Sequence, residues 1–223
     1  MFNKLDIDKK LSEMGMQQSM SEEEIDFVNF VNFIHIAKNA GTSMQKFITN
    51  NPELNIKYHG HNAPISKLSN QMIIIRNPLD RFCSAVEYAI KYYSDSTKIQ
   101  KILAAGLTTP SDWAEAWANP TSPYHPLILN EVMNHSHEID NKSITYKWTY
   151  EPQISWYKAE NIAYIIRFEN IDQNFMKLFN KKISKENKSL NKAKKHKKMS
   201  ETAINFLREF YRSDFELWES ANI

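Results

Sequence analysis

Lys38–Ser43 combines residue types that can bind an anion. It places a lysine, a glycine and two hydroxyl side chains between an apolar run and a helical pattern. A glycine in such a strand-to-helix turn lets backbone N–H groups converge on an anion at the helix N-terminus. The segment is not a Walker A loop, because the lysine precedes the glycine and no Gly-Lys-Ser/Thr ending follows. An ordinary helix start is the alternative, and the local pattern fits both.

A second anion-binding segment follows the apolar run Gln71–Ile75. Arg76 stands at the end of that run, and Asn77–Pro78 suits the N-cap and first position of a helix. We therefore expect Arg76 at the mouth of a helix and Ser84 about two turns inside it. A guanidinium there suits bidentate phosphate binding. Alternatively, Ser84 has no role in binding and Arg81 is a surface ion-pair partner.

The third segment, Tyr58–His61, contains two histidines separated by Gly60. Imidazole is the side chain best matched to accepting a proton from a hydroxyl near neutral pH. Gly60 lets the backbone bend, so that His59 or His61 could face a substrate. A simple turn without catalytic function is the alternative.

Alternating strand and helix patterns determine where these segments lie. We expect strands at Phe27–Ile36, Ile56–Tyr58, Gln71–Ile75 and Ile162–Phe168. Helices are expected after Ser43, from Pro78 to about Tyr93, and at Pro110–Asn119, Asp172–Asn180 and Glu201–Tyr211, with a last short helix opened by a capping box at Ser213–Glu216. This order predicts a three-layer, P-loop-like α/β fold with a mainly parallel sheet. Ligands of such sheets bind beyond the carboxyl ends of strands, which places all three segments at one rim.

Composition limits the class of protein. The chain has 223 residues with a net charge of +2, four glycines and one cysteine, Cys83, which excludes an internal disulfide. We expect a polar leader at residues 1–26 and one domain at 27–223. No run is long enough to span a membrane, and the start lacks the apolar core of a signal peptide, so we expect a cytoplasmic protein. Nine lysines and one acid fall in Lys181–Lys198, which favours a local anion site over general nucleic-acid binding.

Taken together, these segments resemble the PAPS-dependent carbohydrate sulfotransferases (sulfotransferase family 2). Tyr58–His61 is similar to the His-Gly-His stretch of the heparan sulfate 2-O-sulfotransferase branch. The resemblance spans about residues 30 to 218. Its motifs are Ile34–Ser43, Ile75–Ala85, Tyr150–Gln153, Ile166–Ile171 and Phe210–Leu217. This chain departs from the usual motifs at Ala37, where the family has proline, at Asn39, where threonine is common, and at Thr149, where histidine is common.

The resemblance implies an enzyme that transfers a sulfuryl group from 3′-phosphoadenosine 5′-phosphosulfate to a hydroxyl, here expected on a carbohydrate, without a metal. The donor-binding residues that it implies are Lys38, Asn39, Ala40, Gly41, Thr42, Ser43, Arg76 and Ser84. Lys38 would also stabilise the leaving group, and His61, or else His59, would accept the proton. Two other functions stay open: a non-catalytic module that binds acidic polysaccharide, and an atypical nucleotide kinase.

Overall fold

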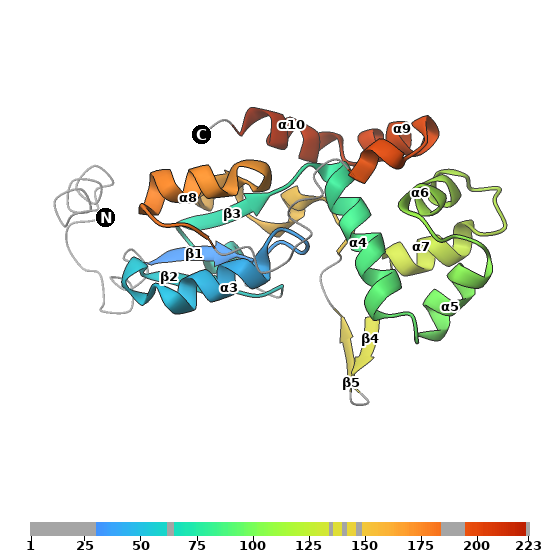
Figure 1. Ribbon diagram of the computed structural model, residues 1–223, viewed down its shortest axis with the longest axis horizontal. Coiled ribbons are helices and arrows are strands. Elements are labelled where there is room, and N and C mark those ends of the chain that lie inside the picture. Colours follow the sequence, from blue (N-terminus) through green and yellow to red (C-terminus); the bar gives the residue numbers. More distant parts are fainter. Residues whose placement is uncertain are drawn as a thin grey trace.

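The computed structural model describes residues 30–61, 65–133, 136–139, 142–145, 149–183 and 195–221 (Figure 1). The expected leader at 1–26 lies outside these residues, as do 27–29 and the middle of the lysine-rich segment, 184–194. The sheet has four parallel strands in the order β2-β1-β3-β6. Their bounds are β1 Val31–Ile34, β2 Ile56–His59, β3 Gln71–Ile75 and β6 Ile162–Arg167.

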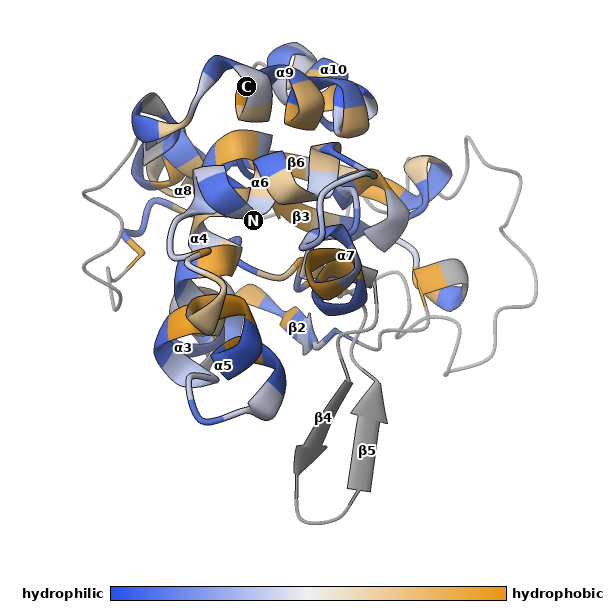
Figure 2. Ribbon diagram, turned by 90° about the vertical axis from the view of Figure 1, so that its right-hand side faces the viewer, coloured by the Kyte–Doolittle hydropathy of each residue, from blue (hydrophilic) through white to orange (hydrophobic). Residues whose placement is uncertain are grey.

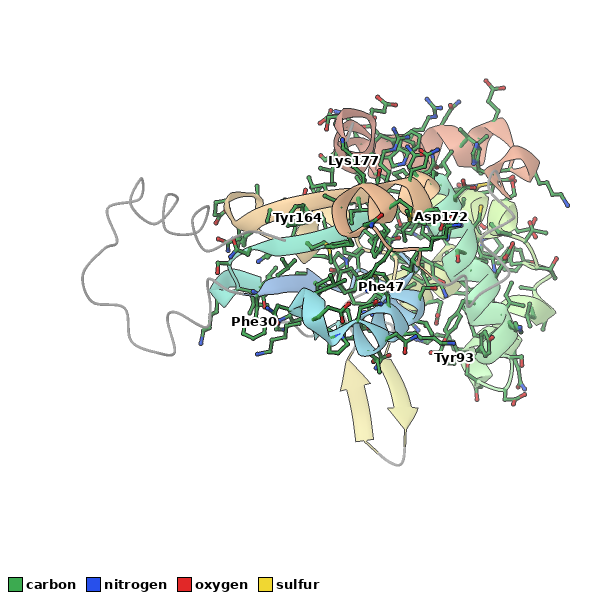
Figure 3. The ribbon with its side chains drawn as sticks, turned by 60° about the vertical axis from the view of Figure 1, so that its left-hand side comes forward. Phe30, Phe47, Tyr93, Tyr164, Asp172 and Lys177 are labelled. Carbon is green, nitrogen blue, oxygen red and sulfur yellow. The ribbon has the colours of Figure 1, made fainter. Side chains whose placement is uncertain are left out.

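Successive apolar side chains of the strands point to opposite faces of the sheet, so that both faces are buried. One face packs against α3 (Gly41–Asn50) and α8 (Ile171–Phe179), through a core that includes Phe33, Phe47 and Phe175. The other face packs against α10 (Arg212–Ser220) and the short helix η3 (Gln153–Trp156). Figure 3 shows Phe47 of α3 beneath the sheet and α8. The described residues therefore form the expected α/β fold, with helices on both faces of a parallel sheet.

A second group of helices lies beside the sheet, on the right of Figure 1. It contains α4 (Pro78–Tyr92), α5 (Thr97–Ala104), α6 (Pro110–Ala118), α7 (His125–Met133) and α9 (Glu201–Phe210). These helices share one core built around Phe82, Trp113 and Leu207. In Figure 2, α9 and α10 are hydrophilic on their outer sides and hydrophobic toward the body of the molecule. The strands β4 (Ser136–Ile139) and β5 (Lys142–Thr145) form a separate antiparallel pair.

Most predicted elements are present within a residue or two of their expected bounds. The prediction that a capping box at Ser213–Glu216 opens the last helix is wrong. Helix α10 begins after Tyr211 without a side-chain cap. Ser213, expected as the N-cap, lies inside the helix. Asp214 accepts hydrogen bonds from the backbone N–H groups of Gln153 and Ile154 at 2.7 and 3.1 Å. Within the described residues, no helix is long and apolar enough to cross a membrane.

Candidate anion-binding and proton-transfer site

The Lys38 loop and Arg76 meet at the carboxyl ends of the two central strands, β1 and β3. The next strand of the sheet after β1 is β2, which lies on one side of this pair, and the next after β3 is β6, which lies on the other side. The direction of the connections therefore reverses between them, and such a switch point is where open α/β sheets bind ligands. Arg76 Nη1 donates to the Lys38 carbonyl oxygen over 3.4 Å. The fold thus brings together two segments that are 38 residues apart.

The loop between β1 and α3 has an unusual backbone. Lys38 and Ala40 have φ values of 67° and 63°, in the left-handed region that non-glycine residues seldom adopt. The N-cap residue Ala40 supplies no side-chain cap, and the first helical hydrogen bond runs from Met44 N–H to the Ala40 carbonyl. The N–H groups of residues 41 to 43 precede that bond. They form the end of a helix dipole at which an anion is stabilised.

A buried amide pair fastens this loop to the strand beside it. The Asn39 side chain donates to the Ile74 carbonyl and to Gln153 Oε1, at 2.8 and 2.6 Å. Gln153 also exchanges two hydrogen bonds, both of 2.9 Å, with the backbone of Arg76. Gln153 belongs to the motif Tyr150–Gln153, which has no function that can be assigned from the sequence. In the structure it joins the loop, Arg76 and, through Asp214, helix α10.

Arg81 is a second internal support, and the alternative of a surface ion-pair partner is wrong. Its side chain is 1% exposed. Nε donates to the Ala37 carbonyl at 3.1 Å, and Nη1 donates to the Glu151 carbonyl at 2.7 Å. The same loop is therefore held from α4 as well as from the strand. The hydrogen bonds of Asn39 and of Arg81 hold the left-handed backbone of this loop in place, which is otherwise an unfavourable conformation.

His35 is part of the site and was not identified from the sequence. Its ring lies so close to Gly41 that a Cβ on Gly41 would sit 1.8 Å from His35 Nε2. A hydrogen bond of 2.7 Å joins His35 Nδ1 to the Tyr58 hydroxyl. The ring of His61 is 4.3 Å away, centroid to centroid. Gly41 is thus required because only a residue without a side chain leaves room for this imidazole.

The two histidines of Tyr58–His61 occupy different environments. His59 Nε2 donates to Asn32 Oδ1 at 2.8 Å, since the Asn32 amide nitrogen already donates to Ser69. His61 lies between His35 and Trp156, whose ring centroid is 5.7 Å from its own. Burial lowers the pKa of His61, a hydrogen bond to the His35 backbone opposes this shift, and the positive charges of Lys38 and Arg81 add to it. Of these two histidines, His61 is therefore the one whose pKa responds to the charges of Lys38 and Arg81.

Burial, together with the nearby charges of His61 and Lys38, lowers the pKa of His35 from 6.5 to about 3. In the unfolded chain His35 is protonated as the pH falls through about 6.5, whereas in the folded protein it stays neutral at that pH. The stability that depends on a neutral His35 is therefore complete above pH 6.5 and is lost as the pH falls toward 3. Between pH 7 and pH 5, we expect the wild type to lose about 2 kcal/mol more unfolding free energy than a His35→Asn variant. Urea unfolding of both proteins measures this difference, and parallel losses would contradict the assignment.

Ser84 lies on α4 one turn before Tyr88, and the Lys38 ammonium group is 3.6 Å from the centroid of the Tyr88 ring. Arg76 is 3% exposed, and its guanidinium stacks on Phe168 at 4.6 Å.

One more basic residue contacts the first turn of α4, which contains Asp80. His196, in the described end of the lysine-rich segment, shares a 3.0 Å hydrogen bond with the Asp80 carboxylate.

Glu169 has a structural function. Its carboxylate accepts hydrogen bonds from Asn77 N–H at 2.8 Å and from Trp218 Nε1 at 3.0 Å. Cys83 is buried, with its sulfur 3.4 Å from that of Met199, and so packs as a small apolar residue.

Among the described residues, no three His, Cys, Asp or Glu side chains form a group that could hold a metal ion. Comparison of the chain with protein-family models, curated proteins and solved structures finds no match.

Proposed function

We propose that this protein is a sulfotransferase with a P-loop-like fold, which moves a sulfuryl group from 3′-phosphoadenosine 5′-phosphosulfate to a hydroxyl of a carbohydrate. The observation that carries the proposal is the junction of the Lys38 loop with Arg76 at the switch point of the sheet. A helix N-terminus and a lysine lie on one side of this junction, and a guanidinium lies on the other. This arrangement suits a nucleotide that has a phosphate group at each end.

In the proposed complex, the N–H groups of Ala40–Ser43, which begin α3, bind the 5′-phosphosulfate. Arg76 and Ser84 bind the 3′-phosphate. Both assignments use groups that donate hydrogen bonds to anionic oxygens. Because the Arg76 guanidinium stacks on Phe168 and donates to the Lys38 carbonyl, it is held in position before the nucleotide binds. Such preorganisation reduces the entropy lost on binding.

Transfer then needs two further groups. The acceptor oxygen forms a bond to sulfur while the bond from sulfur to the bridging oxygen breaks, which releases adenosine 3′,5′-bisphosphate. Lys38 stabilises the negative charge that grows on the bridging oxygen, an interaction that is strongest in the transition state. His61 accepts the proton of the acceptor hydroxyl, and its lowered pKa keeps the ring neutral, and therefore able to do so, near pH 7.

Binding of two nucleotides tests the donor site. By calorimetry, the wild type should bind adenosine 3′,5′-bisphosphate about 10- to 100-fold more tightly than adenosine 5′-monophosphate, because a hydrogen-bonded charge is removed with the 3′-phosphate. Arg76→Ala should remove this preference and leave binding of the monophosphate nearly unchanged. Unfolding of the variant is measured in parallel to show that it is folded. Equal affinity of the wild type for the two nucleotides would contradict the proposal.

Lys38→Ala is expected to slow transfer about 10²- to 10³-fold while the protein still binds adenosine 3′,5′-bisphosphate. The assay incubates the protein with labelled donor and a panel of glycans, and follows label transfer by mass spectrometry. Lys46→Ala, on the exposed side of α3, is the matched control and should stay within about twofold of the wild type. A polysaccharide-binding module would bind the glycans but neither nucleotide, and full activity of Lys38→Ala would count against the mechanism.

A further inference from the structure

The ring of His35 has a nitrogen that is available to a ligand beside the start of α3. Nδ1 shares its 2.7 Å hydrogen bond with the Tyr58 hydroxyl. Within the described part of the chain, Nε2 has no hydrogen-bond partner. Since the residue is only half-buried, a bound molecule can reach this nitrogen.

The ring of His35 lies with its face against Gly41. A Cβ on Gly41 would be 1.8 Å from Nε2, 2.1 Å from Cε1 and 2.2 Å from Cδ2. Because these three distances are so similar, the Cβ position is above the plane of the ring and not on the line of an Nε2–H bond, where the two carbons would be much farther away than the nitrogen. A hydrogen on Nε2 therefore passes alongside Gly41, next to the N–H groups that begin α3.

Tyr58 determines which nitrogen of His35 carries the hydrogen. The pKa of His35 is lowered by burial to about 3, so the ring is neutral at pH 7 and has one N–H. Burial also raises the pKa of Tyr58, which keeps its phenolic hydrogen. Among the described residues, the acceptor for that hydrogen is His35 Nδ1. The hydrogen-bond network thus assigns the hydrogen of the imidazole to Nε2.

We infer that His35 is a further ligand of the bound anion, and that its Nε2–H donates a hydrogen bond to an oxygen of the group held at the start of α3. The inference rests on the proposed function for the identity of that group, the 5′-phosphosulfate. A neutral imidazole adds a directed donor without adding a charge, whereas Lys38 supplies the charge.

Nitrogen NMR of the full-length protein tests both the tautomer and the contact. At pH 7, a two-bond ¹H–¹⁵N spectrum should show the hydrogen of His35 on Nε2, and the His35 signals are identified by their absence from a His35→Asn variant. Inorganic sulfate should shift the Nε2 resonance more than chloride does at the same ionic strength. A hydrogen on Nδ1, or an Nε2 resonance that neither sulfate nor adenosine 5′-monophosphate shifts, would overturn the inference.

Two variants separate a hydrogen bond from a packing role. The amide nitrogen of glutamine can replace Nε2, whereas the shorter asparagine can replace only Nδ1. By calorimetry, His35→Asn should bind adenosine 5′-monophosphate about 10-fold more weakly than the wild type, and His35→Gln should stay within about threefold. His59→Asn is the matched control and should bind as the wild type does. Equal losses in the two His35 variants would mean that the ring only fills space, which refutes the hydrogen bond.

Failure of this inference differs from failure of the proposed function. If only the inference fails, the wild type still prefers adenosine 3′,5′-bisphosphate to the monophosphate, and sulfate leaves the His35 resonance unchanged. If only the proposed function fails, that preference is absent while sulfate still shifts the resonance. If both hold, His35→Asn weakens binding of the two nucleotides equally and keeps the preference, because Arg76 is unchanged.

Discussion

A His61→Asn variant is expected to transfer the sulfuryl group about 10²- to 10⁴-fold more slowly than the wild type, with little change in its affinity for the nucleotide. Asparagine is polar and smaller than histidine, but it cannot accept a proton at neutral pH. Because burial lowers the pKa of His61 below 6.5, the wild-type rate should be constant above that value and should fall only at lower pH. The variant should lose this acidic limb. Rate measurements from pH 5 to pH 8 on both proteins test the assignment.

His59→Asn is the matched comparison, since it changes the same residue type two positions earlier. His59 uses Nε2 to bind Asn32 and lies on an edge strand, away from the charges that His61 senses. Its replacement should lower the rate less than 10-fold and leave the pH profile in place. If the larger loss and the flat profile appear with His59→Asn instead, the two histidines have been assigned in the wrong order.

Gly41→Ala is expected to destabilise the protein by at least about 3 kcal/mol and to abolish nucleotide binding. The new Cβ would overlap the His35 ring, whose three nearest atoms are all within 2.2 Å of its ideal position. Either His35 leaves its hydrogen bond with Tyr58, or the start of α3 moves away from the anion site. Urea unfolding and calorimetry with adenosine 3′,5′-bisphosphate measure the two effects.

Gly60→Ala provides the control, because a Cβ at Gly60 would meet no atom within 4 Å. It should change the free energy of unfolding by less than about 0.5 kcal/mol. The double variant Gly41→Ala with His35→Ala should regain much of the stability lost in Gly41→Ala, because the overlapping ring is gone. Additive losses in this cycle would show that the two residues do not compete for the same space.

Elements governed by local patterns could be predicted from the sequence. The strand Gln71–Ile75 was predicted with its observed bounds, because a strand buried on both faces is continuously apolar. Asn77 caps its helix as expected, since a cap depends on residues only two or three positions away. Helices α5 and α7 were not predicted.

Contacts between distant segments could not be predicted. The position of His35 in the site depends on Tyr58, 23 residues later, and on the space left by Gly41. Nothing in the sequence near Arg81 shows that it turns inward to the Ala37 and Glu151 carbonyls. Ser213 and Glu216 have the spacing of a capping box, yet the helix begins before them, and it is Asp214 whose carboxylate binds the backbone of another helix. A local pattern shows which groups can form hydrogen bonds, but the tertiary fold decides which partners they meet.

The hydrogen bonds that Asp214 accepts from Gln153, and that Gln153 accepts from Asn39 and Arg76, have a consequence for biosynthesis. The residues of the candidate anion-binding loop leave the ribosome long before Asp214, which follows Gln153 by 61 residues. Until that carboxylate emerges, the nascent polypeptide lacks the acceptor that holds the Gln153 backbone in position. All four strands of the sheet precede Asp214 in the chain, so the candidate anion-binding loop gains this support only after the whole sheet has been synthesised.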